Sequence, residues 1–262
     1  MRAQGEWEWL SDSASLLPPC DGAVSYYSQF GRTPGFIDAA GRRFRGILDE
    51  HLDLFRWPEG AKADSALCVE GAGGRLFHWI LPSFFQLLVD LVQEGRSFSV
   101  VFRTFGSDLP RALAAVSRAL GGAHPLFPDL PALKLQVDLT PGEIRSSEGG
   151  TVLSRADRRL STQDGDGDRD LYRYLSSLRG LGGFQDHFAW WASNSFSARG
   201  GKPLWVDPFD QQVQHIFIDD NIRHNDDDTI VQPKVHDRPR RTRRTRRTQR
   251  PPRTRRDLGE TS

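Results

Sequence analysis

Two adjacent carboxylates, Asp219 and Asp220, directly follow a short apolar run in the stretch HIFIDDNI, residues 215–222. The run has the residue types of a β-strand, so the pattern predicts a strand that ends on two acidic side chains. Neighbouring carboxylates repel each other and cannot enter a core unpaired. One explanation is a turn or helix cap, where Asp and Asn are favoured. The other is a divalent cation, which binds oxygen ligands at the carboxyl edge of a sheet.

Two further side chains could complete such a site. Thr104 ends the apolar run SFSVVFRT, and its hydroxyl could hold a phosphoryl oxygen. Lys202 lies in the stretch ARGGKPLW, and its ammonium could neutralise both a phosphoryl group and a nearby carboxylate. Taken singly, a threonine at a strand end has a structural role and a lysine is solvated at the surface. Their interpretation as a site therefore depends on the elements that carry them.

The periodicity of apolar residues places these side chains in an alternating series of helices and strands. We expect helices over 81–95, 107–122, 170–181 and 184–194, strands over 97–105, 133–139 and 215–220, and a loop over 141–167. Such a series is typical of α/β proteins, in which the carboxyl ends of parallel strands carry functional residues. The predicted fold class is therefore α/β with a Rossmann-like parallel sheet.

The sequence resembles motifs two, three and four of the haloacid dehalogenase (HAD) superfamily of phosphohydrolases. The residues that carry the resemblance are, in this order, Thr104 at a strand end, Lys202, and the Asp219–Asp220 pair. The resemblance covers about residues 97–228. Within the superfamily, the sequence is most similar to a little-characterised HAD-like group with an IF(I/F)DDNI run. The resemblance implies that the two aspartates hold Mg²⁺. It also implies that Thr104 and Lys202 bind phosphate and act as catalytic residues during in-line phosphoryl transfer.

The first motif of that superfamily, a strand ending in DxDx(T/V), is missing from this sequence. In the family its first Asp attacks phosphorus and its second acts as general acid and base. FIDAAG holds a single Asp, and QVDLTPG follows the second motif and lacks a second Asp. We therefore expect no nucleophile, and binding of a phosphorylated small molecule or protein without turnover. We also expect a chain that is incomplete at its N-terminus, because the missing strand belongs at the centre of the sheet.

Charge is unevenly distributed along the chain. Residues 238–262 contain eleven arginines against Asp257 and Glu260, a local charge of +9 that leaves −8 on residues 1–237. The run from Arg238 to Arg256 is rich in RRT and has no apolar residue except proline, which predicts a disordered tail. Three explanations remain open: a nucleic-acid-binding arm, a nuclear-targeting signal, or sequence from a shifted reading frame or retained intron.

Composition predicts a soluble intracellular protein in three parts. No apolar run approaches the roughly 18 residues that span a bilayer, and Cys20 and Cys68 lack metal-ligand or redox spacing. We expect a cytoplasmic protein without a membrane partner, with the nucleus as the alternative if the tail is genuine. The predicted parts are a helical or irregular region that could form a cap, 1–80, the HAD-like core, 81–232, and the disordered tail, 233–262.

Overall fold

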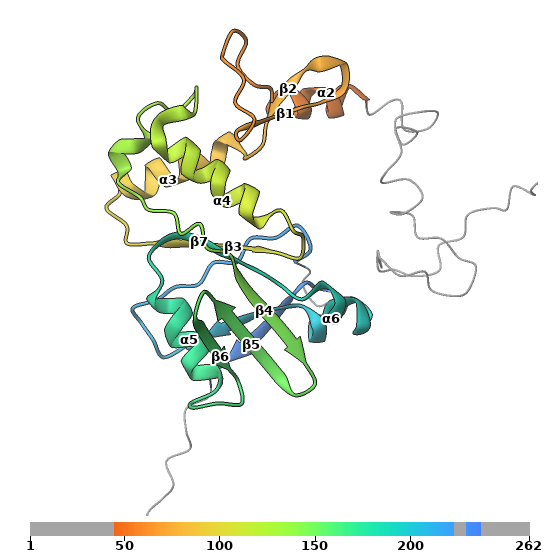
Figure 1. The fold of residues 1–262 in the computed structure, drawn as a ribbon, viewed down its shortest axis with the longest axis vertical. Helices are drawn as coiled ribbons and strands as arrows, with labels where there is room; N and C mark the ends of the chain where they lie inside the picture. Colours follow the sequence, from red (N-terminus) through yellow and green to blue (C-terminus); the bar gives the residue numbers. More distant parts are fainter. Residues whose placement is uncertain (1–44, 223–228, 237–262) are drawn as a thin grey trace, which may run out of the picture.

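The computed structural model describes residues 45–222 and 229–236 (Figure 1). Its α-helices are α2 (Arg45–Asp53), α3 (Pro82–Gln93), α4 (Leu109–Arg118), α5 (Asp168–Ser177) and α6 (Phe188–Ser193). Its short helical turns are η3 (Ala72–Gly74), η4 (Ala119–Ala123), η5 (Leu130–Leu133) and η6 (Ala198–Gly200). Its strands are β1 (Cys68–Glu70), β2 (Leu76–His78), β3 (Ser99–Thr104), β4 (Gly142–Ser147), β5 (Gly150–Arg155), β6 (Arg158–Ser161), β7 (Gly180–Gln185), β8 (Lys202–Val206) and β9 (Val231–Val235).

Five of these strands form the main sheet, in the order β3-β7-β4-β5-β6. β3, β7 and β4 run parallel, whereas β4, β5 and β6 form an antiparallel meander. β3 pairs with β7 along its whole length, from Ser99 opposite Gly180 to Thr104 opposite Gln185. The predicted α/β class is therefore confirmed, but the sheet is mixed rather than purely parallel, because consecutive hairpins build one end of it.

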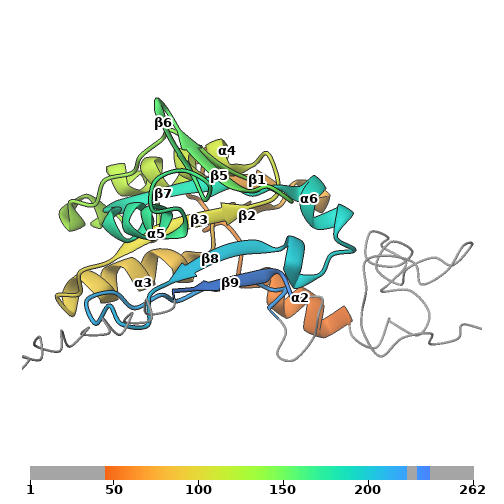
Figure 2. The same ribbon diagram turned by 90° about the horizontal axis from the view of Figure 1, so that it is seen from below.

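Two smaller pairs of strands lie outside the main sheet. β1 and β2 are antiparallel, and β8 and β9 are parallel, with Lys202 opposite Val231. Figure 1 shows α3 and α4 together beside the β3–β7 end of the main sheet, and Figure 2 shows β8 and β9 as a separate layer. β9 ends at Val235, shortly before the described residues end at 236.

The strongly periodic segments fold as the sequence predicts. The helix expected over 81–95 is α3, which begins at Pro82 and buries Phe85 and Leu88. Proline is tolerated in the first helical turn, and Gly95 adopts the positive φ of 69° that follows the end of the helix. The strand expected next is β3, and the following helix is α4 continued by the η4 turn.

The prediction of a loop over 141–167 is wrong, because this segment forms β4, β5 and β6. Antiparallel strands with one solvated face need apolar residues only at alternate positions. Ile144 and Leu153 are fully buried, while Glu143 and Arg145 beside Ile144 are charged and Ser154 beside Leu153 carries a hydroxyl. Gly142 begins β4 against the Phe184 ring, where a Cβ atom would lie 2.2 Å from the ring Cδ1. The polar composition therefore reflects a half-exposed meander.

The helices predicted over 170–181 and 184–194 are too long, because the inner strand β7 lies between α5 and α6. Its sequence, GLGGFQ, pairs with β3 on one side and β4 on the other. Glycine weakens a strand in isolation, but it also admits neighbours that approach closely. A Cβ atom on Gly183 would lie 2.5 Å from Cδ1 of Leu109 on α4. Gly183 therefore lets α4 pack directly on the sheet.

Two predicted strands join no sheet among residues 45–222 and 229–236. The segment 133–139 keeps one isolated bridge, between Val137 and Leu181. The segment 215–220, predicted as the third strand of the site, is extended, and its residues alternate between half-buried and exposed. Alternation fixes which side of an extended chain faces the protein, but a strand also requires a neighbouring backbone to bond with. The prediction that a strand ends on Asp219 and Asp220 is therefore wrong.

The apolar core beside α3 and α4 contains two stacked histidines. His78 and His124 are 7% and 2% exposed, and their nearly parallel rings lie 5.0 Å apart between centroids. Trp57 contacts both rings, and Phe85 contacts that of His124. Within the described part of the chain, both ring nitrogens of His78 and Nε2 of His124 lack a hydrogen-bond partner. Burial lowers the pKa of both imidazoles, that of His124 to about 4.

We predict that the protein loses stability as the pH falls from 6.5 to about 4. In the unfolded chain these imidazoles take up protons near their ordinary pKa of 6.5, whereas the buried rings of the folded protein resist protonation. The unfolded state then binds more protons, so the free energy of unfolding decreases across this window. Urea denaturation at a series of pH values measures the slope.

The variant His124→Asn isolates this effect. Asn keeps an acceptor for the Leu126 N–H, which bonds to Nδ1 of His124 at 3.3 Å, but it cannot be protonated. Its stability should therefore depend less steeply on pH. His51→Asn, which changes an exposed imidazole on α2, is the matched control and should keep the wild-type slope. Equal slopes for His124→Asn and the wild type would contradict the prediction.

Candidate functional site

A buried ion pair joins two of the residues that the sequence singles out. Lys202 begins β8, and its Nζ donates a hydrogen bond of 2.7 Å to Oδ2 of Asp219. The two side chains are only 6% and 9% exposed. The same ammonium donates to the backbone carbonyl of Arg103 in β3 at 3.3 Å, and it lies 5.1 Å from the centroid of the Phe105 ring. The pair therefore holds the end of the extended segment against the carboxyl end of β3.

The surroundings of Asp219 favour its ionised form. Burial alone would raise its pKa, but the Lys202 ammonium and the Asn221 backbone N–H, which donates to Oδ1 at 3.0 Å, bring the pKa below its usual value. The adjacent Asp220 is exposed and accepts a hydrogen bond from Nδ2 of Asn221 at 3.2 Å. Two carboxylates thus lie side by side, one paired with a lysine and one facing solvent.

Thr104 lies at the carboxyl end of β3, as the sequence predicts, but its hydroxyl already has two partners. Oγ1 donates to Oδ1 of Asp108 at 3.0 Å and accepts the N–H of Gly106 at 2.9 Å. Hydroxyl groups often stabilise turns in this way. Lys202 bonds to the carbonyl of Arg103, the residue before Thr104. The hydroxyl of Thr104 itself closes the turn that leads into α4.

A second buried ion pair, which the sequence did not predict, lies beside the first. Nε and Nη2 of Arg103 donate to the two carboxylate oxygens of Asp186 at 2.8 and 2.5 Å, and the two side chains are 9% and 1% exposed. Nη1 of Arg103 also donates to the carbonyl of Pro203 at 3.1 Å. The signal was present in the run SVVFRTF, because an arginine within an apolar strand requires an anionic partner. Asp186, which follows β7, gave no separate signal because β7 was not recognised.

The aspartate pair is the candidate metal site. In residues 45–222 and 229–236, no group of three or more His, Cys, Asp or Glu side chains converges as a metal site. Mg²⁺ needs fewer protein ligands, since it is usually held by one or two carboxylates with waters and phosphate oxygens. The exposed Asp220 carboxylate and the remaining lone pairs of Asp219 fit this smaller requirement.

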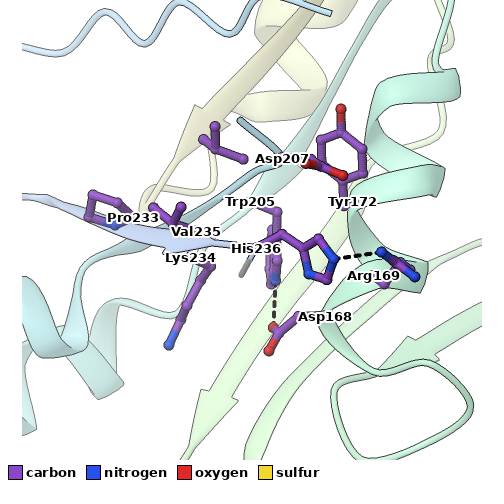
Figure 3. A pocket seen from close by; sticks show the side chains of 10 residues that line it. Asp168, Arg169, Tyr172, Trp205, Asp207, Pro233, Lys234, Val235 and His236 are labelled. Carbon is purple, nitrogen blue, oxygen red and sulfur yellow. Dashed lines mark hydrogen bonds between the residues drawn. The ribbon is translucent and has the colours of Figure 1, made fainter. Parts of the chain in front are cut away.

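Two surface cavities lie away from these residues. The larger, of about 280 Å³, is bounded by α5, β8 and β9 (Figure 3). At its wall, Arg169 donates to Nε2 of His236 at 2.6 Å, and Nε1 of Trp205 donates to Asp168 at 2.7 Å. The smaller, of about 220 Å³, lies beside the turn between β4 and β5. Neither cavity is lined by a residue of the predicted site, so the ion pairs do not belong to either hollow.

Several sequence predictions fall outside the structural description. The arginine-rich run from Arg238 to Arg256 and most of the predicted cap region lie in residues 1–44 and 237–262, which are not described, so their proposed roles stay predictions. No helix in the described ranges is long and apolar enough to cross a membrane. In comparisons with known proteins, no family model, curated sequence or solved structure matches this chain.

We predict that Lys202→Met lowers the free energy of unfolding by about 3 to 5 kcal/mol, because it leaves the Asp219 carboxylate buried without its partner. Adding Asp219→Leu should restore part of the loss, since the second change removes the unpaired charge. Chemical denaturation of both variants measures this coupling. Glu94→Gln breaks the exposed Arg96–Glu94 pair and should change the stability by less than about 1 kcal/mol. Equal effects of Lys202→Met and Glu94→Gln would show that the Lys202 pair is not buried in solution.

Proposed function

We propose that this protein is a HAD-like α/β domain that binds Mg²⁺ together with a phosphorylated ligand and has no nucleophile of its own. The observation that supports the proposal is the buried Lys202–Asp219 pair at the carboxyl end of β3, next to the exposed Asp220. One ammonium and two carboxylates at the same edge supply both signs of charge that a phosphate group and its cation require. Thr104 would add its hydroxyl to a phosphoryl oxygen after releasing Asp108.

In this proposal the two ligands help each other to bind. The Lys202 ammonium is bonded to Asp219, so a cation held by Asp219 and Asp220 would weaken that bond and free the ammonium for a phosphate oxygen. A phosphate group would in turn draw the lysine away and leave Asp219 open to the cation. By linkage, each ligand increases the affinity for the other by the same factor.

The described carboxylates near this edge do not replace the missing nucleophile. Asp186 is buried there, but Arg103 binds both of its oxygens. Asp108 bonds to the hydroxyl of Thr104. Nucleophilic catalysis requires a group that is free to attack and is activated by its neighbours, and neither carboxylate meets this condition. The proposed function is therefore binding rather than hydrolysis.

Calorimetric titration of the full chain with MgCl₂, with and without inorganic phosphate, tests the binding. We expect Mg²⁺ to bind, phosphate to strengthen that binding, and Asp220→Asn to weaken it by about tenfold or more. Asp220 is exposed, so this change spares the buried pair. Asp157→Asn, in the exposed turn between β5 and β6, removes the same charge elsewhere and should leave the affinity unchanged. Identical affinities for the wild type and Asp220→Asn would contradict the assignment of the site.

We expect the full chain to show no phosphatase activity. With p-nitrophenyl phosphate and Mg²⁺, hydrolysis by the wild type should equal that of Asp219→Asn and Asp220→Asn, because no described carboxylate serves as nucleophile. Asp220→Asn is included since it leaves the buried ion pair intact. Robust turnover that both variants abolish would refute the non-catalytic assignment while leaving the metal site in place.

A further inference from the structure

The segment 213–220, VQHIFIDD, lies outside the described helices and strands, and its backbone has no backbone partner in the described ranges. The burial of its residues alternates strictly, which indicates an extended course. Its side chains alternate in burial, so that two large apolar residues face outward. Ile216 is 76% exposed and Ile218 is 84% exposed. Unpaired extended segments of this kind readily pair with another chain, because their free N–H and C=O groups form a template for a new strand.

The opposite side of the segment is attached to the protein at three points. The ring of His215 lies 5.7 Å from that of Tyr172 on α5. Phe217 packs against the buried cluster that contains Trp191 and Ile230. Asp219 is bonded to Lys202. The outward face is therefore presented by a chain that is already fixed in an extended conformation.

We propose that this segment pairs antiparallel with the same segment of a second copy, across a two-fold axis at Phe217. In this register Ile216 of each copy lies opposite Ile218 of the other, so both exposed isoleucines gain an apolar cross-strand neighbour. His215 lies opposite Asp219 of the second copy. The segment ends on Asp219 and Asp220 of the proposed ligand site, but the pairing requires no bound ligand.

Charge and symmetry favour a second copy over other occupants. Residues 213–218 carry no Asp, Glu, Lys or Arg, so two copies meet without repulsion along this run. Antiparallel pairing sets Asp219 opposite His215 and Asp220 opposite Gln214, whereas parallel pairing would set carboxylates opposite each other. A self-complementary patch of this kind gives a closed dimer. A pair of short strands is smaller than the standard interface of about 1,600 Å², so we expect a Kd in the micromolar range or weaker.

Sedimentation velocity of the full chain over a range of concentrations tests the pairing. The wild type should show a concentration-dependent monomer–dimer equilibrium. Ile216→Lys and Ile218→Glu should each raise the Kd at least about tenfold, because each places a charge opposite an isoleucine. An equimolar mixture of the two variants should dimerise again, since the register sets the new lysine opposite the new glutamate. Leu54→Lys, at a residue that is 71% exposed elsewhere, is the control and should leave the Kd unchanged.

Hydrogen exchange of the wild type gives a second readout that needs no variant. Amide exchange across 213–220 should slow as the concentration rises, because the pairing bonds these N–H groups. A monomer at all concentrations would overturn the proposal, and slow exchange in that monomer would assign the segment to a partner strand within the chain. A dimer that is insensitive to Ile216→Lys, or a mixture that fails to recover, would overturn the register.

Discussion

The desolvation of two adjacent ion pairs is the constraint on which this structure depends. Arg103 with Asp186 and Lys202 with Asp219 are all nearly buried, and charges in such places require partners with good geometry. β3 and β7 share a ladder, but β8 belongs to a different pair of strands. The bonds from Arg103 to Pro203 and from Lys202 to the Arg103 carbonyl therefore link the two sheets at one edge. The same pairs fix where Asp219 and Asp220 lie.

Sequence patterns predicted the elements whose burial repeats regularly, and they failed where burial depends on a specific neighbour. α3 and β3 were predictable because their apolar residues face a core on a fixed period. β7 was not predictable, because its glycines are explained only by neighbours distant in sequence, such as Leu109 on α4, which approaches Gly183. The β4–β6 meander was hidden by its polar face, on which charged residues such as Arg158 are exposed. β7 and the β4–β6 meander depend on contacts between residues that are distant in sequence, and a short stretch of sequence does not show such contacts.

The candidate site was predictable in part for a related reason. Residue types and order singled out Lys202 and Asp219, and the structure bonds them. The role of Thr104 was less predictable, because a hydroxyl at a strand end can contact a ligand or close a turn, and here it bonds to Asp108 and Gly106. Asp186 could not be found from sequence, since its partner Arg103 lies on a strand that only tertiary pairing brings next to β7. The chemical type of a side chain can therefore be read directly from the sequence, whereas its hydrogen-bond or ion-pair partner depends on the tertiary structure.

The segment 213–220 shows how the buried charges and the exposed apolar surface are connected. Ordering a free peptide into a strand costs conformational entropy, which normally weakens association. Here Asp219 is already bonded to Lys202 and Phe217 already packs on a core, so most of that ordering accompanies folding of the monomer. Because inward and outward positions alternate along the segment, fixing Phe217 and Asp219 inward places Ile216 and Ile218 on the outer face. Their exposure to water is unfavourable. A chain fixed in this way loses little further freedom on pairing, and the apolar surface that it buries then acts almost entirely in favour of association.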